Sequence, residues 1–274
     1  MPTQAHDPLP TLSTSVALFL DVDGTLLEIA PVPQSVSVSA GLRSLLHALQ
    51  RSLGGALALV SGRSIADLTR LFAPLRLPMA GLHGFERRDA SGACHRNPAP
   101  PAATLGAARE VMSRLAAQHP GLLVEDKEFA LALHYRLAPQ LETVALECMR
   151  ALTARLEGDL ELQRGKMVLE LRPAGATKAA AVAAFLAQPP FAGRLPLYLG
   201  DDLTDESAFE LVNAAGGLSV LVGSARDSAA GAGLPGVTAV HEWLALLESD
   251  PAAAIGRLSA PTALEDRRLR SASP

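Results

Sequence analysis

The stretch FLDVDGTLLEIA (residues 19–30) places two carboxylates directly after an apolar run, and this arrangement indicates how the chain folds. The run extends from Ser15 to Leu20 and is short and uninterrupted, as is typical of a strand buried on both faces of a parallel sheet. Asp21 and Asp23 follow at once, with a glycine and a threonine behind them. The stretch therefore predicts a buried strand that ends in a turn or in a polar site at the sheet edge.

The segments that follow repeat an alternation of helix and strand. Leucines at helical spacing across 42–49 predict a helix, and the apolar segment 56–60 predicts a second buried strand. Ser64 and Asp67 form a capping pair typical of the start of a helix, and 78–82 predicts a third strand. This β-α-β-α-β order is typical of a doubly wound α/β fold.

The alternation changes after the proline-rich stretch NPAPPAA (97–103), which predicts a crossing into another domain. A helix is expected at 104–118, followed by LLVEDKEFALALHYRL (122–137). The second half of this segment alternates like a strand, with Phe129, Leu131, Leu133 and Tyr135 on one face. A second helix is expected at 139–157. In ELQRGKMVLELRP (161–173) charged and apolar residues again alternate, so that the charged ones share one face of a strand. These segments predict a small antiparallel α+β insert with one charged face.

The α/β alternation resumes with the helical segment 176–187, and continues through a strand at 196–200, a helix at 205–215 and a strand at 218–223. We therefore expect a doubly wound, mostly parallel, Rossmann-like α/β core with an inserted α+β cap domain. The predicted boundaries are a disordered tail at 1–14, the core at 15–100 and 171–254, the cap at 101–170, and a disordered tail at 255–274.

The overall composition argues against several classes of protein. With 274 residues, 49% of them hydrophobic, the chain can form one large or two modest domains. A net charge of -4 provides no basic field for nucleic acid, and the longest apolar run, 179–187, is too short to span a bilayer. Cys94 and Cys148 are too few for a disulfide framework or a zinc site, and residues 1–14 lack the pattern of a signal peptide. We expect a cytoplasmic protein that is a monomer or a weak homo-oligomer.

Four polar motifs lie at the ends of predicted strands or at the start of the following helix. Each alone has an ordinary explanation as a turn, a helix start, a solvated lysine or a capped loop. Their joint occurrence at one sheet edge, where open α/β sheets bind ligands, favours a functional site. The motifs are D-V-D-G-T (21–25), S-G-R (61–63), Lys178 and G-D-D-L-T-D-E (200–206).

The chemistry of these motifs suits phosphoryl transfer. Carboxylates crowded at one edge repel each other unless a hard cation lies among them, and Mg²⁺ takes oxygen ligands. One carboxylate can attack phosphorus as a nucleophile, while a second transfers protons. A hydroxyl and an ammonium, such as those of Ser61 and Lys178, suit the phosphoryl oxygens.

This ordered set of motifs resembles the haloacid-dehalogenase-type phosphotransferases. The resemblance implies that Asp21 is the nucleophile and Asp23 the general acid and base. It also implies that Ser61, Gly62 and Lys178 bind the phosphoryl group. The implied Mg²⁺ ligands are Asp21, Asp23 through its main-chain carbonyl, Asp201, and Asp205 through water, with Asp202 supporting the metal shell.

Further strings resemble the trehalose-6-phosphate phosphatases and extend over nearly the whole ordered chain, from about 15 to 245. They are SGR, GLHGFE (81–86), VEDK…HYR (124–136), LELRP (169–173) and GDDLTDE. One departure is Ala179, where family members often have glycine, and we expect it to be tolerated. The resemblance implies that the cap recognises a sugar, because carboxylates and cationic donors suit a ring of hydroxyls. The implied sugar-binding residues are Glu125, Lys127, Arg136, Lys166 and Glu170.

Ordinary structural roles remain open for several cap residues. Arg136 and Arg172 could be solvated strand residues, because long charged side chains normally lie outside. Glu125 and Lys127 could lie at a hairpin tip. His83 is expected to be structural rather than catalytic.

The function implied by the resemblance is Mg²⁺-dependent hydrolysis of trehalose 6-phosphate to trehalose and phosphate through an aspartyl-phosphate. Another sugar phosphate, such as sucrose 6-phosphate, remains an alternative substrate, because hydroxyl stereochemistry depends on side-chain placement. A non-catalytic phosphosugar sensor is disfavoured because none of the essential groups is missing. A mutase is disfavoured because no further basic cluster indicates a second phosphate site. The expected partner is a small sugar phosphate, with neither nucleic acid nor membrane.

Overall fold

The apolar run before Asp21 forms β1 (Val16–Leu20), the strand from which the larger sheet extends in both directions. All five residues of β1 are buried, and the strand pairs in parallel with a neighbour on each side. The buried strand predicted from the sequence is confirmed. The computed structural model describes residues 16–29, 36–127, 129–156 and 160–258.

Within the described residues the larger sheet has eight strands, of which the six from β12 to β3 run parallel. Their carboxyl ends therefore lie at one edge, where polar loops can meet. In spatial order the strands are β12 (Ala232–Leu234), β11 (Leu218–Val222), β10 (Leu195–Gly200), β1, β2 (Leu57–Val60), β3 (Met79–Gly81), β4 (Glu86–Arg88) and β5 (Cys94–Arg96).

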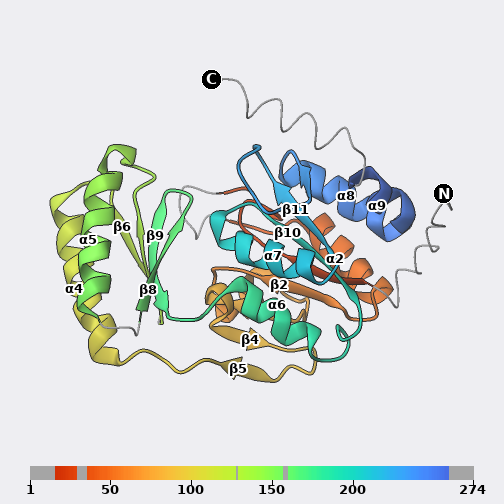
Figure 1. Cartoon of the computed structure of the whole chain (residues 1–274), viewed down its shortest axis with the longest axis horizontal. Coiled ribbons are helices and arrows are strands. Elements are labelled where there is room, and N and C mark those ends of the chain that lie inside the picture. The colour runs from red at the N-terminus through yellow and green to blue at the C-terminus, as the bar shows by residue number, and fades with distance from the viewer. Residues whose placement is uncertain (1–15, 30–35, 128, 157–159, 259–274) are drawn as a thin grey trace, which may run out of the picture.

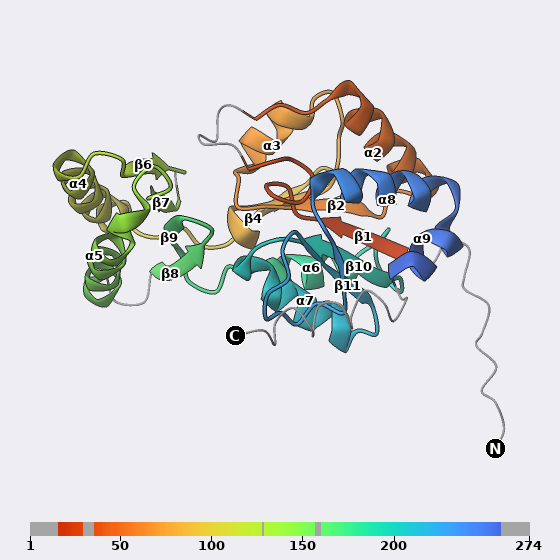
Figure 2. The same ribbon diagram turned by 90° about the horizontal axis from the view of Figure 1, so that it is seen from above.

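Helices cover both faces of this sheet, as the alternation of elements predicts (Figure 2). One face buries Leu18 and Leu20 beneath α2, α3, α8 and α9. The other buries Phe19 beneath α6 and α7, and its ring stacks on Phe191 with centroids 5.5 Å apart. The helices are α2 (Ala40–Ser52), α3 (Ile65–Phe72), α6 (Lys178–Leu186), α7 (Glu206–Ala214), α8 (Val237–Ser249) and α9 (Pro251–Leu258).

Three of these helices begin where the sequence provides a hydroxyl cap. Ser39, Ser64 and Thr177 precede α2, α3 and α6, and each side chain accepts a hydrogen bond from a main-chain N–H of the first turn. Such caps satisfy donors that have no partner within the helix. The predicted pairing of Ser64 with Asp67 is confirmed by a 3.1 Å bond from the Asp67 N–H.

The insert forms a separate layer beside the core (Figure 1). Its antiparallel sheet packs against α4 and α5 through a hydrophobic cluster that includes Leu131, Leu133, Leu169 and Leu171. The opposite parity of the sheet carries Glu170, as the alternation predicts. The elements of this cap are α4 (Ala102–Gln118), β6 (Leu123–Asp126), β7 (Leu131–His134), the 3-10 turn η3 (Pro139–Leu141), α5 (Glu142–Arg155), β8 (Leu160–Gly165) and β9 (Val168–Pro173).

Several boundaries differ from those predicted. The limit at residue 170 is wrong because it cuts β9, which pairs with β7 and β8 and ends only at Pro173. The tail predicted from residue 255 is wrong for its first four residues, because α9 extends to Leu258 and buries that side chain. The remaining predicted tail segments, 1–14 and 259–274, lie outside the described residues.

Two further differences concern residues near the domain crossing. The antiparallel hairpin β4–β5 extends the sheet beyond β3 and was not predicted from its short, polar strands. Phe129 was expected to share a face with Leu131, yet it packs against Phe85 of the core with ring centroids 5.2 Å apart. The reason is that β7 begins only at Leu131, so strand alternation does not extend to Phe129.

Among the described residues, no helix is long and apolar enough to cross a membrane.

Candidate functional site

The four sequence motifs meet at the carboxyl edge of the parallel strands. Asp21 follows β1, Ser61 follows β2 and Asp201 follows β10, three strands that are direct neighbours in the sheet. Lys178 enters the same edge as the first residue of α6. The predicted convergence of the motifs is therefore present in the folded chain.

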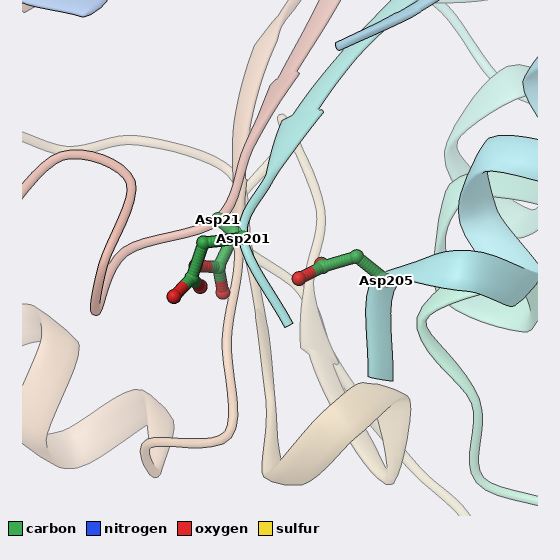
Figure 3. A group of neighbouring side chains, drawn as sticks. All are labelled: Asp21, Asp201 and Asp205. Atoms are coloured by element: carbon green, nitrogen blue, oxygen red, sulfur yellow. The ribbon is translucent and has the colours of Figure 1, made fainter. Parts of the chain in front are cut away.

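Three carboxylates form the acidic part of this edge. Asp21, Asp201 and Asp205 each have a carboxylate oxygen within 4.8 Å of the other two. Figure 3 shows Asp21 and Asp201 beside each other, with Asp205 directed toward them from the start of α7. Gly24 permits this packing, because its φ is +91° and a Cβ there would lie 2.0 Å from Asp201 Oδ2.

Lys178 neutralises part of this charge. Its Nζ donates to Asp21 Oδ1 at 2.8 Å and to Asp205 Oδ1 at 2.7 Å, and the residue is 2% exposed. Tyr198 also donates to Asp205 Oδ1, at 2.6 Å. Burial lowers the pKa of a lysine, but these two carboxylates outweigh it and hold the pKa of Lys178 well above its usual range.

The remaining negative charge is not balanced by the described side chains. Burial, opposed by Lys178 but reinforced by Asp205 and Asp201, raises the pKa of Asp21 well above its ordinary value. Burial and the nearby Asp205 raise the pKa of Asp201 to about 7. Asp21 Oδ2 is buried and has no hydrogen-bond partner among the described residues. A hard cation with oxygen ligands, such as Mg²⁺, fits this donor set.

Asp202 and Asp205 also shape the loop that carries Asp201. The turn η4 (Leu203–Asp205) is closed by a capping box in which Asp205 Oδ2 accepts from the Asp202 N–H at 3.0 Å. Asp202 is not part of the three-carboxylate group. Its side chain accepts from the main-chain N–H of Leu203 at 2.7 Å and from that of Lys166, in the cap, at 3.3 Å.

Asp23 is held apart from the acidic group by Arg63. The guanidinium donates to both oxygens of Asp23 at 2.6 Å, an arrangement that fixes the direction of the carboxylate. Ser61 is 1% exposed and its Oγ accepts from the Arg63 N–H at 3.1 Å. The S-G-R motif thus connects the hydroxyl at the strand end with the second aspartate of D-V-D-G-T.

The cap contributes a second set of charges above this edge. Lys127 donates to Glu170 Oε2 at 2.6 Å and to the main-chain carbonyl of Gly62 at 3.2 Å, so the cap touches the core here. Glu125 lies 2.8 Å from His134 Nε2. Arg136 donates to the Lys166 carbonyl at 3.0 Å.

Arg172, by contrast, is buried and forms an ion pair with Glu161 at 2.7 Å, so the solvated role considered for it is wrong.

A single pocket collects nearly all the residues predicted for the site. Asp205 is wholly buried beneath it and does not belong to the described lining. Of the predicted residues, those that line the pocket are Asp21, Asp23, Ser61, Gly62, Glu125, Lys127, Arg136, Lys166, Glu170, Lys178, Asp201 and Asp202.

Sequence reasoning missed three partners in this region: Arg63, His83 and Tyr198. Arg63 belongs to a motif that was recognised, so its position beside Ser61 could have indicated it. Tyr198 lies two residues before the end of β10, on a buried strand where a hydroxyl needs a partner. His83 was expected to be structural; it lines the pocket with Nε2 3.5 Å from Glu170 Oε1, a pairing that was not predicted because no sequence signal connects the two residues.

Comparisons with known proteins agree with this geometry. A family model described as trehalose-phosphatase matches residues 19–232. The chain is 44% identical over 248 residues to the trehalose-6-phosphate phosphatase of Escherichia coli, covering 89% of this chain and 91% of that one. It is 47% identical over 221 residues to a probable trehalose-phosphate phosphatase of Sinorhizobium fredii, covering 80% and 83%.

A solved structure is similar over the same region. The C-terminal domain of the C. albicans trehalose-6-phosphate phosphatase superposes with a TM-score of 0.77 at 27% sequence identity. The match covers 86% of this chain and 93% of that domain, so it includes both the core and the cap.

Proposed function

The chain belongs to the trehalose-phosphatase family, and on that premise we propose that it hydrolyses trehalose 6-phosphate to trehalose and inorganic phosphate. The observation that carries the proposal is one pocket with two contrasting walls. Asp21, Asp201 and Lys178 line the core side, while Glu125 and Glu170 line the cap side. The first wall suits a phosphoryl group and the second suits sugar hydroxyls.

Asp21 is the nucleophile in this proposal. Lys178 binds its Oδ1 and leaves Oδ2 without a hydrogen-bond partner among the described residues, which supports attack by Oδ2 on phosphorus. The P–O bond to the sugar breaks as the aspartyl-phosphate forms, and the leaving oxygen takes a proton from Asp23. Water then gives a proton to Asp23 and attacks phosphorus, and the bond to Asp21 breaks to release phosphate.

Ser61, Gly62 and Lys178 bind the phosphoryl oxygens in this scheme. The Ser61 hydroxyl and the Lys178 ammonium line the same pocket as Asp21. Both are nearly fully buried, so their dipole and charge act on the phosphoryl group with little screening by water. Arg63 holds the Asp23 carboxylate by two hydrogen bonds, which supports a fixed direction for proton transfer.

Mg²⁺ is the cofactor we propose for this site. Asp21, Asp201 and the main-chain carbonyl of Asp23 would hold the ion, and Asp205, whose two oxygens already accept hydrogen bonds, would act through water. When bound, it would balance the clustered carboxylates and the phosphoryl charge. Burial and the nearby Asp205 raise the pKa of Asp201 to about 7, and Asp21 Oδ2 is buried without a hydrogen-bond partner among the described residues; a bound cation would relieve both costs, which supports this assignment.

The cap selects the sugar in this proposal. Glu125, Lys127, Arg136, Lys166 and Glu170 all line the pocket and supply both acceptors and donors. Hydroxyls can pair with either kind of group, and a sugar that leaves buried polar groups unpaired is rejected. Because the family match is to trehalose-phosphatases, we expect trehalose 6-phosphate to be hydrolysed faster than sucrose 6-phosphate.

Phosphate release from a panel of sugar phosphates tests the proposal. The purified protein is assayed on trehalose 6-phosphate, sucrose 6-phosphate and glucose 6-phosphate, with Mg²⁺ and after its removal by a chelator. We expect the fastest release from trehalose 6-phosphate, loss of activity on chelation and its return when Mg²⁺ is added back. Asp21→Asn keeps the shape of the side chain but is a poor nucleophile, so its activity should fall to background.

Asp227→Asn makes the same chemical change at an exposed position and should retain wild-type activity. Equal rates on several disaccharide phosphates would keep the reaction and contradict the sugar assignment. Full activity in Asp21→Asn would contradict the mechanism.

A further inference from the structure

A buried polar chain links the cap sheet to the phosphate-binding segment of the core. It begins at Gly62, whose carbonyl accepts from Lys127 Nζ at 3.2 Å. Lys127 in turn donates to Glu170 Oε2 at 2.6 Å. The other oxygen of Glu170, Oε1, lies 3.5 Å from His83 Nε2, so the chain returns to the core.

The core end of this chain is held in an unusual backbone conformation. His83 has φ 56° and ψ 27°, in the left-handed region that a side chain other than glycine seldom adopts. The His83 N–H donates to the Ser61 carbonyl and the Leu82 N–H to the Arg63 carbonyl, both at 3.0 Å. The loop is therefore bound to the main chain of S-G-R, and this binding holds the strained residue in place.

The imidazole of His83 lies directly against Gly62. A Cβ at Gly62 would be 2.6 Å from His83 Nε2, so only glycine admits the ring at this separation. Gly62 thus contacts the ring of His83 from the core and the ammonium of Lys127 from the cap. The ring therefore lies between the Ser61–Gly62 segment, which it touches, and the cap carboxylate Glu170, which is 3.5 Å away.

His83 Nε2 faces Glu170 Oε1, an oxygen that lacks a donor. The oxygen is buried, and it has no hydrogen-bond partner in the described part of the chain. A carboxylate only accepts, so the facing Nε2 must carry a proton to pair with it. Burial lowers the pKa of His83, which favours a neutral ring with that single proton. Closing the 3.5 Å gap by about half an ångström would make a normal hydrogen bond.

We propose that His83 is a positioning residue that sets the cap carboxylate Glu170 relative to the phosphoryl-binding segment at Ser61 and Gly62. This assignment rests on the proposed function, since it takes Glu170 as a sugar-binding group. His83 acts through Glu170 and the cap contact, so its effect belongs to recognition of the sugar. The phosphoryl group alone does not require the cap carboxylate.

Two substitutions at His83 separate this role from a general structural one. In His83→Gln the side-chain amide can place an N–H near the position of Nε2, whereas in His83→Asn the shorter amide cannot reach Glu170. We expect His83→Asn to raise the KM for trehalose 6-phosphate about tenfold, because the shorter amide leaves no N–H that could approach the buried Glu170 Oε1. The inhibition constant for inorganic phosphate should stay within about twofold of the wild-type value, because inorganic phosphate carries no sugar that could contact Glu170. In His83→Gln the KM should return most of the way to the wild-type value.

Three outcomes would overturn the assignment. An unchanged KM in His83→Asn would show that Glu170 does not depend on the ring. A parallel rise in the KM and in the inhibition constant for phosphate would show that His83 only supports the phosphate-binding segment. The KM of His83→Gln could also be as high as that of His83→Asn while both variants melt at the wild-type temperature. That result would show that the N–H at the position of Nε2 does not position Glu170.

A second measurement needs no substrate and therefore remains decisive if the proposed function fails. Free energies of unfolding are measured for His83→Asn, for Glu170→Gln and for the double variant. Effects that do not add in the double variant support the contact between the two side chains, and additive effects overturn it. If wild type releases phosphate from no sugar phosphate, the proposed function is wrong, while this cycle still decides whether His83 positions Glu170.

Discussion

Buried charges at single residues determine whether this site can form. Lys178 lies between Asp21 and Asp205 at 2.8 and 2.7 Å, and Lys127 contacts Glu170 at 2.6 Å. Removing one member of such a pair leaves an uncompensated charge in a medium that solvates it poorly. Both lysines thus stabilise the fold and shape the site at once.

Glu170 makes the stability of the cap depend on pH. Burial would raise its pKa, but the Lys127 ammonium, together with the facing N–H of His83, outweighs burial and holds the pKa well below its usual value of 4.5. A carboxyl whose pKa is depressed by folding stabilises the fold above its unfolded pKa, and that contribution is lost as the pH falls toward the folded value. Glu170→Gln should therefore lower the free energy of unfolding by about 3 kcal/mol at pH 7. The difference from wild type should shrink below pH 4.5.

Urea unfolding at several pH values measures this difference. Glu147→Gln is the matched control, because Glu147 is an exposed residue of α5 in the same domain. The control should track wild type throughout. A Glu170→Gln deficit that does not change with pH would contradict the electrostatic explanation.

At the scale of elements, the start of a helix places Lys178, whereas Asp21, Ser61 and Asp201 follow the ends of strands. α6 begins at Lys178 itself, and the preceding Thr177 accepts from the Ala180 N–H at 3.0 Å. The Thr177 hydroxyl therefore fixes the first turn of α6 and, with it, the direction of the Lys178 side chain. α3 begins in the same way, with Ser64 as its cap one residue after Arg63.

Thr177→Ala should separate the catalytic from the stabilising effect of a helix cap. We expect it to cost about 1 kcal/mol of stability, because a first-turn N–H loses its acceptor. It should also lower kcat several-fold, because Lys178 lies in the turn that frays. Ser39→Ala removes the equivalent cap of α2, which carries none of the predicted site residues, and should cost similar stability without the loss of kcat. Equal loss of kcat in both variants would contradict the link to Lys178.

At the scale of the whole molecule, two domains with separate hydrophobic clusters line one pocket. The cap has its own cluster, which includes Met149, and the faces of the larger sheet have separate clusters, one of which includes Val212. Residues from both domains line the pocket. The predicted fold class is confirmed by the structure and by its solved relatives, and the predicted enzyme class, a phosphoric monoester hydrolase, by the family match.

Separate cores predict that a cavity in one domain loosens mainly that domain. Met149 is fully buried in α5, and Met149→Ala should cost about 2–5 kcal/mol. Amide hydrogen exchange should accelerate across 102–173 while the strands of the larger sheet stay protected. Val212→Ala, at an equally buried position in α7, should give the reverse pattern. Faster exchange throughout the molecule in either variant would contradict this independence.

Much of the site could be predicted because its motifs are local and the sheet is parallel. Asp21 and Asp201 each follow an apolar strand, and neighbouring parallel strands end at the same edge, so their meeting follows from order alone. The pairing of Asp23 with Arg63 did not follow from order. Side chains at the same edge can point in several directions, and only the packed structure selects one.

The sequence by itself determined the alternation of elements, the insertion of a cap and the identity of the charged groups at the sheet edge. These depend on hydrophobic periodicity and on short motifs, which are properties of contiguous residues. The tertiary structure alone decided that Lys127 reaches the Gly62 carbonyl and that His83 faces Glu170. Such contacts join residues far apart in the chain, and their distances depend on how the cap domain packs against the core domain.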